Sequence, residues 1–127
     1  MLAARNRLTS PDQFREVVRR GHRAGGPLLV VHLLERRSHA PDGAPRAGLV
    51  VSKAVGTAVA RNLVKRRLRH LLRYRLSLLP EGAMLVVRAL PAAASAEYDE
   101  LADELDRCLR KGLGRLEGHP AQVSHSR

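Results

Sequence analysis

The longest regular pattern of hydrophobic and polar positions in the chain covers residues 56–75. It has the period of an α-helix, contains no Pro, and offers Thr57 as an N-cap. At about 100° per residue its hydrophobic side chains fall within one arc, formed by Val64, Leu68 and Leu71, with Ala60 and Leu78 at its edge. We therefore predict a central helix that buries one aliphatic face.

A second arc of the same helix is cationic. It spans roughly 100° and is filled by Asn62, Lys65, Arg66, Arg69 and Arg73. Like charges one turn apart repel each other by roughly 0.2–0.5 kcal/mol per pair, and residues 54–79 contain no Asp or Glu to offset this. The alternative is a solvated basic face, but such faces normally mix both signs of charge. The pattern favours a surface that a polyanion neutralises.

Two further helical patterns flank the central one. Ser10, followed by a proline, is typical of a helix start, and Gly21 is expected to end this helix as a C′ residue. Ser95 is the candidate N-cap of the last helix, which we expect Gly112 and Gly114 to stop. The two apolar faces are formed by Phe14, Val17 and Val18, and by Tyr98, Leu101, Leu105, Cys108 and Leu109.

Short apolar runs between the helices predict strands, which cover residues 22–24, 28–34, 46–52 and 83–89. Residues 36–45 contain the Pro, Asp and Gly of a hairpin loop, so the third run is expected to return beside the second. The element order α-β-β-β-α-β-α predicts an α+β two-layer sandwich, with the helices packed on one four-stranded sheet.

The length of 127 residues suits one domain, which we assign to residues 1–114, with a basic leader at 1–9 and a frayed tail at 115–127. The net charge of +11 points to nucleic acid or an anionic membrane surface. Cys108 is the only cysteine, which favours a reducing compartment. Because no apolar run approaches the ~20 residues of a membrane span, we expect a cytoplasmic protein without a membrane partner.

The sequence offers no evident catalytic or metal-binding cluster. Its six histidines lack metal-ligand spacing; they are His22, His32, His39, His70, His119 and His125. Six acids gather in residues 97–106, which we interpret as an exposed helix face. If the protein takes part in catalysis, its own side chains are not expected to perform the chemistry.

The stretch from Val51 to Arg69, VSKAVGTAVARNLVKRRLR, resembles the signature of the protein subunit of bacterial ribonuclease P. That family has a strand ending in Ser-Lys-Lys, a Gly, and then Ala-Val-x-Arg-Asn-Arg-x-Lys-Arg running into a helix. The matching residues are Val51, Ser52, Lys53, Gly56, Ala58, Val59, Arg61, Asn62, Lys65, Arg66 and Arg69. The resemblance extends to Arg5-Asn6-Arg7-Leu8 and covers roughly residues 5–112.

The resemblance implies a ribosomal-protein-like fold with a left-handed β-α-β crossover, an exception to the usual right-handed rule. It also implies a protein that supports a catalytic RNA in removing the 5′ leader of precursor tRNA. The partners would be the ribonuclease P RNA subunit and precursor tRNA, and no protein partner would be required. The chemistry would belong to Mg²⁺ held mainly by the RNA.

Carried over residue by residue, the family's contacts to the RNA subunit fall on Lys53, Arg61, Asn62, Lys65, Arg66 and Arg69, to which we add Arg73 as a compensating cation. The groove for the leader falls on Phe14, Val18, Val30 and His32. For Phe14 and His32, ordinary packing in the core is the alternative to stacking on a base.

The chain departs from the family pattern at several positions. Leu63 replaces the second arginine of the motif and Ala54 replaces the second lysine, while Val18 and His32 stand where aromatic residues are common. Two other functions remain open. A structural ribosomal protein of similar fold would also use a basic helix. A nuclease or DNA-binding regulator would need an acid–base, metal or helix-turn-helix pattern that the sequence lacks.

Overall fold

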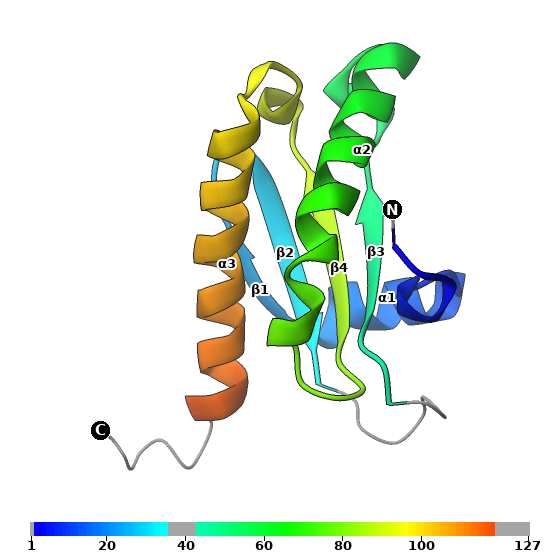
Figure 1. Cartoon of the computed structure of the whole chain (residues 1–127), viewed down its shortest axis with the longest axis vertical. Coiled ribbons are helices and arrows are strands. Elements are labelled where there is room, and N and C mark those ends of the chain that lie inside the picture. Colours follow the sequence, from blue (N-terminus) through cyan, green and yellow to red (C-terminus); the bar gives the residue numbers. More distant parts are fainter. Residues whose placement is uncertain (1, 36–42, 119–127) are drawn as a thin grey trace.

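The computed structural model describes residues 2–35 and 43–118. It contains one mixed sheet and three α-helices (Figure 1). The strands are β1 (His22–Gly25), β2 (Leu29–Leu34), β3 (Arg46–Val50) and β4 (Met84–Ala89), and the α-helices are α1 (Pro11–Arg20), α2 (Ala58–Arg73) and α3 (Tyr98–Gly118). The predicted α+β fold and element order are confirmed.

The strands lie in the order β1-β2-β4-β3, so the predicted hairpin between β2 and β3 is wrong. Instead β4 lies between them, antiparallel to β2 and parallel to β3. The physical reason is that β4 is apolar on both faces: Leu85 packs with one core cluster and Val86 with the other. A strand with two apolar faces is best buried in the middle of a sheet.

The connection from β3 to β4 has the unusual hand that the resemblance implied. In Figure 1 the chain rises along β3, descends along α2 in front of the sheet, and rises again along β4, which lies to the left of β3. A right-handed crossover would place β4 on the other side of β3. The left-handed crossover is therefore confirmed.

The hydrophobic core has two parts, one on each face of the sheet. The larger part lies between the sheet and the α2–α3 layer and includes Val31, Leu85, Leu68 and Leu105. The smaller part lies on the face of the sheet that carries α1, where Val17 packs with Leu8, Met84 and Val86. Every fully buried large side chain in the described residues is Leu or Val.

The start of α1 follows the prediction and its end does so for a different reason. Ser10 Oγ accepts a hydrogen bond from the Gln13 N–H at 3.4 Å, as an N-cap does. Gly21 follows the helix with φ of −75°, so it is no left-handed C′ residue. Glycine is needed there because a Cβ would lie 2.6 Å from the Val17 carbonyl oxygen.

The last helix starts later and ends later than predicted. Ser95 closes a 3₁₀ turn (Pro91–Ser95), and α3 begins at Tyr98, with the Glu100 carboxylate accepting a hydrogen bond from Glu97 N–H. The prediction that Gly112 stops the helix is wrong, because α3 continues to Gly118. A Cβ on Gly112 would lie 3.3 Å from Leu33, so this glycine lets α3 approach the sheet closely. Residues 115–118 thus belong to α3, and the remainder of the predicted tail lies outside the described residues.

One acid of α3 is buried, contrary to the prediction of a fully exposed acidic face. Glu104 exposes 4% of its surface. Its carboxylate accepts hydrogen bonds from the backbone N–H groups of Leu28 at 2.7 Å and Leu29 at 2.8 Å, and it pairs with Arg107 at 3.1 Å. These bonds fix α3 against the turn between β1 and β2, since removing the carboxylate would leave two N–H donors without a partner.

Candidate nucleic-acid interface

A glycine and two caps set the position of α2 and of the residues that precede it. Ser52 Oγ accepts from Ala54 N–H and caps a 3₁₀ turn (Lys53–Val55), which exposes Lys53. Gly56 then adopts φ of +148°, a conformation that side chains disfavour. Thr57 Oγ1 accepts from Ala60 N–H at 3.2 Å, which confirms the predicted N-cap. The basic signature is thereby held on a rigid helix.

The helix buries the predicted arc and exposes the other one. Val64, Leu68 and Leu71 are buried together with Leu72, which the prediction missed, whereas Leu78 lies beyond the helix and is exposed. The opposite arc, which we call the cationic face, consists of Asn62, Lys65, Arg66, Arg69 and Arg73. All of these are exposed except Lys65, which is half-buried.

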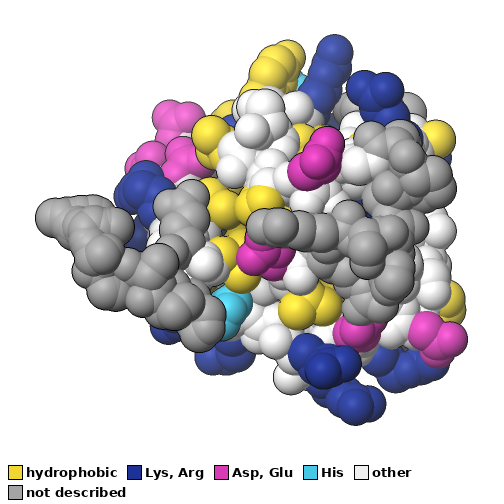
Figure 2. All heavy atoms as spheres, turned by 90° about the horizontal axis from the view of Figure 1, so that it is seen from below, with side chains coloured by type: hydrophobic (Ala, Val, Ile, Leu, Met, Phe, Trp, Pro, Cys, Tyr) yellow, Lys and Arg dark blue, Asp and Glu magenta, His cyan; other side chains and the backbone are white. Residues whose placement is uncertain are grey.

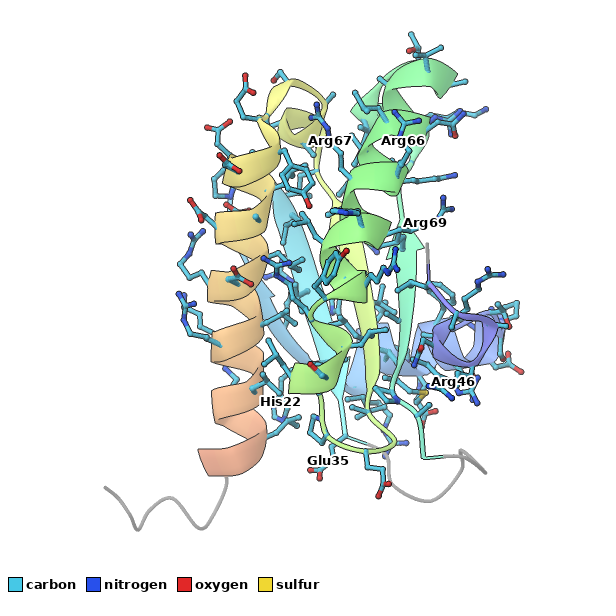
Figure 3. All side chains as sticks on the ribbon, viewed as in Figure 1. His22, Glu35, Arg46, Arg66, Arg67 and Arg69 are labelled. Atoms are coloured by element: carbon cyan, nitrogen blue, oxygen red, sulfur yellow. The ribbon has the colours of Figure 1, made fainter. Side chains whose placement is uncertain are left out.

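The cations of this face lack acidic partners. Within residues 2–35 and 43–118, no printed ion pair involves Lys65, Arg66, Arg69 or Arg73. Arg66 and Arg69 project from α2 on the side away from α3 (Figure 3). Arg67, by contrast, lies toward α3 and donates to the Ala96 carbonyl oxygen at 3.1 Å, so it serves packing between the helices. Mutual repulsion on the cationic face is therefore relieved only by solvent or by an anionic partner.

Arg61, also predicted to contact RNA, differs from the rest. It is half-buried at the first turn of α2, and its Nε has no hydrogen-bond partner in the part of the chain that the structure describes. A buried N–H donor without a partner is costly and uncommon. Leu63, which replaces an arginine of the family motif, is half-buried beside the cationic face.

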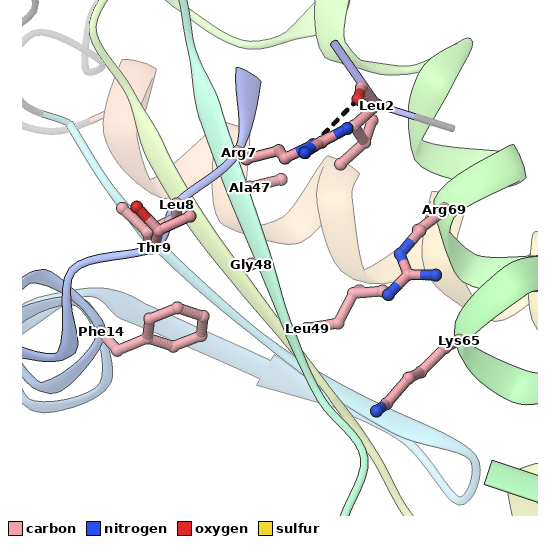
Figure 4. Close-up of a pocket in the computed structure, with 10 residues that line it drawn as sticks. All are labelled: Leu2, Arg7, Leu8, Thr9, Phe14, Ala47, Gly48, Leu49, Lys65 and Arg69. Carbon is pink, nitrogen blue, oxygen red and sulfur yellow. Dashed lines mark hydrogen bonds between the residues drawn. The ribbon is translucent and has the colours of Figure 1, made fainter. Parts of the chain in front are cut away.

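A pocket of about 430 Å³ lies between the cationic face and the edge of β3 (Figure 4). Lys65 and Arg69 reach it from α2, Arg7 from the N-terminal segment, and Phe14 from α1. The Arg7 guanidinium is oriented by a 3.1 Å hydrogen bond from its Nε to the Leu2 carbonyl oxygen. The pocket thus has three cations and an aromatic ring in its lining.

The role of Arg7 was not predicted from the sequence, which suggested only a basic leader. Residues 2–9 in fact pack along the sheet: Leu2 is buried, and Leu8 N–H donates to the Ala47 carbonyl oxygen at 3.0 Å. The matching Arg5-Asn6-Arg7-Leu8 run was the one available signal. Arg5 and Arg73 also line a neighbouring hollow, so cations from the N-terminal segment follow those of α2.

The four residues predicted for the leader groove lie on the face of the sheet that carries α1. Val30 and His32 alternate with the core residues Val31 and Leu33, while Phe14 and Val18 pack on this face from α1. The Phe14 ring lies directly over Gly48, since a Cβ there would be 2.2 Å from Phe14 Cζ. Phe14 is half-buried, so part of its surface remains accessible.

His32 is a packed side chain in this structure. It exposes 5% of its surface, which leaves little ring area for a base to stack on, and its buried Nδ1 has no partner among the described residues. Arg23 of β1 pairs with His32 in register, and Arg88 of β4 lies beside it; both are exposed and neither was predicted. Burial lowers the pKa of His32, and the charges of Arg88 and then Arg23 lower it further.

This shift makes the stability of the protein depend on pH. Because the pKa of His32 is lower in the folded chain than in the unfolded chain, the unfolded state binds more protons as pH falls through about 6.5. We expect the free energy of unfolding, measured with urea at several pH values, to decrease from pH 7 to pH 5.5. The variant His32→Gln should show a smaller decrease, and His70→Gln, at an exposed position, should not. An equal pH dependence for His32→Gln and the unaltered protein would contradict this assignment.

The remaining surface supports a localised interface. Figure 2 views the molecule from the end opposite the N-terminus of α2, and its visible face mixes acidic, basic and hydrophobic side chains. Among the described residues, no three His, Cys, Asp or Glu side chains gather as a metal site, and no helix is long and apolar enough to cross a membrane. The concentration of unpaired cations is a feature of α2 and its surroundings.

Comparison with known proteins agrees with the resemblance read from the signature. A protein-family model described as Ribonuclease P matches residues 2–112. The ribonuclease P protein component of Streptomyces avermitilis is 57% identical over 119 residues, covering 90% of this chain and 97% of that protein. That of a Nocardioides species is 59% identical over 109 residues, covering 86% and 92%.

The fold has a solved counterpart. The structure of Staphylococcus aureus RNase P protein superimposes with a TM-score of 0.72 at 23% identity, over 84% of this chain and 94% of that one. At this identity the likeness shows the fold, while the family follows from the sequence matches. The chain belongs to the family of ribonuclease P protein components, which implies a role in tRNA processing together with a partner RNA subunit.

Proposed function

We propose that the chain binds two RNAs at once and thereby promotes removal of the 5′ leader from precursor tRNA. The ribonuclease P RNA would occupy the cationic face and the adjoining pocket. The observation that carries this proposal is the set of unpaired cations on α2, joined across the pocket by Arg7. Such cations bind RNA by contacting phosphates and releasing condensed counterions.

The 5′ leader would lie on the face of the sheet that carries α1. Phe14 offers a partly accessible ring on which one base can stack, a contact worth about 1–3 kcal/mol. Exposed Arg23 and Arg88 lie on strands beside it and can contact phosphates, while buried Val30 and His32 form the floor. Because only the precursor has a leader, contacts here would favour substrate over product.

The hydrolytic chemistry would be supplied by Mg²⁺ held mainly by the RNA. In the described residues no cluster of carboxylates or imidazoles could hold the ion, and the acids of α3 lie on a helix away from the cationic face. The protein's contribution would be to neutralise phosphates and to position substrate, in the cytoplasm where precursor tRNA is made.

The experiment is cleavage of precursor tRNA by a bacterial ribonuclease P RNA at low Mg²⁺, with and without this protein. We expect strong activation by the protein and no cleavage by the protein alone. Failure to activate despite tight RNA binding, together with co-sedimentation with ribosomal subunits at high salt, would instead indicate a structural ribosomal protein. Cleavage by the protein alone would show that it contains an active site.

A further inference from the structure

Three rings form a cluster that bridges α2 and α3 on the side of α2 away from the pocket. His70 lies edge-on to Tyr74 with ring centroids 5.3 Å apart, and 5.8 Å from the ring of Tyr98. The Nδ1 of His70 is 2.6 Å from the Tyr98 hydroxyl oxygen, within hydrogen-bond distance. Tyr74, the residue that follows α2, is therefore held in place by a ring that is itself tied to α3.

Tyr74 is unusually exposed for this protein. The core is aliphatic, and Tyr74 leaves 63% of its surface accessible, although it is one of only three Phe and Tyr residues in the chain. A single exposed apolar residue needs no explanation. This one, however, is oriented by His70, and the Arg73 guanidinium lies 5.6 Å from its ring centroid. An oriented ring with a cation beside it is the arrangement that single-stranded nucleic acids use for base stacking.

The charges around Tyr74 indicate from which side a ligand approaches. On α2 the cationic face continues to Arg73, next to Tyr74, with no acid anywhere in residues 54–79. On α3 the neighbouring side chains are acidic: Asp99 and Asp103 are exposed, and Asp106 is already paired with Arg75 at 2.6 Å. A polyanion can therefore reach Tyr74 along α2 but is repelled from α3.

We propose that Tyr74 is a stacking platform for an unpaired base of the ribonuclease P RNA, at the end of α2 and beyond the phosphate contacts of the cationic face. This inference rests on the proposed function. Arg73 would hold the phosphate next to the stacked base, and the acids of α3 would mark the edge of the RNA footprint. A protein partner fits less well, because Tyr74 lies between regions of opposite charge and only the cationic one is without partners.

The test measures the dissociation constant of the ribonuclease P RNA over a series of salt concentrations for four variants. We expect Tyr74→Ala to weaken binding about 10-fold at every salt concentration, because loss of stacking releases no counterions. Tyr74→Phe should bind as tightly as the unaltered protein. Leu78→Ala, a matched loss of an exposed apolar side chain, should have no effect. Arg69→Ala should weaken binding and also reduce the salt slope by about one unit.

These arms separate the two proposals. Unaltered binding by Tyr74→Ala, while Arg69→Ala shows its expected loss, would overturn the stacking platform and leave the proposed function intact. An equal loss in Tyr74→Phe would also overturn it, because the hydroxyl rather than the ring would be responsible. If the unaltered protein failed to bind the RNA, the proposed function itself would fail. Thermal unfolding of each variant checks that the exposed substitutions leave the fold intact.

Discussion

Replacing Arg66 and Arg69 together by alanine is expected to weaken binding of the ribonuclease P RNA by about 30–100-fold at moderate salt, and to reduce the salt slope by roughly 1.4–1.8 units. Both side chains are exposed, project away from α3, and lack acidic partners in the part of the chain that the structure describes. Each would therefore be free to contact one phosphate. Filter binding across a salt series measures both quantities.

The same double variant should need more Mg²⁺ to activate the RNA, because the ion must then screen phosphates that the protein no longer neutralises. The matched control is Arg110→Ala with Lys111→Ala, which removes the same charge from exposed positions of α3. If both double variants lose affinity equally, net charge rather than the cationic face is responsible. Unaltered folding is checked by urea denaturation.

The sequence was most informative where local rules determine the structure. The period of residues 56–75, the cap at Thr57 and the turn at Gly56 each depend on neighbours a few residues away, and all three were correct. The order of the strands depends on pairing across the whole chain, so the hairpin chemistry of residues 36–45 suggested the wrong neighbour for β3. Gly112 was misread because its role is close packing against Leu33, which only the fold reveals.

The candidate site divides in the same way. The cationic face could be predicted, because one helix places its side chains by periodicity alone. The partners it acquires from elsewhere could not: Arg7 reaches the pocket through a short parallel bridge to Ala47, and Arg23 and Arg88 flank His32 through strand register. The burial of His32 was likewise invisible, since alternation along β2 does not say how closely α1 and the neighbouring strands cover it.

The pocket also changes how the two proposed RNA sites relate to each other. The sequence suggested separate surfaces, one on α2 and one on α1 and the sheet. In the structure Lys65, Arg69 and Phe14 line the same pocket, on either side of β3 (Figure 4). An RNA subunit on α2 and a leader over Phe14 would therefore be close neighbours, and Arg7 could contact either one. This arrangement would let the protein align the substrate with the RNA that cleaves it.

Phe14→Ala is expected to raise the apparent KM for precursor tRNA by about 10-fold, within the 1–3 kcal/mol range of base–aromatic stacking. Binding of mature tRNA, which lacks the leader, should be unaffected. Steady-state cleavage by the holoenzyme and competition by mature tRNA measure the two quantities. Because Phe14 also packs over Gly48, the alanine variant can lose stability as well.

The variant Phe14→Leu separates stacking from packing. Leucine keeps most of the apolar contact with the sheet but has no aromatic face, so its KM for precursor should rise nearly as much as that of Phe14→Ala while its unfolding midpoint changes little. A normal KM for Phe14→Leu would mean that the ring serves only the small core of Leu8, Val17 and Val86. An equal effect on precursor and mature tRNA would place the leader elsewhere on the protein.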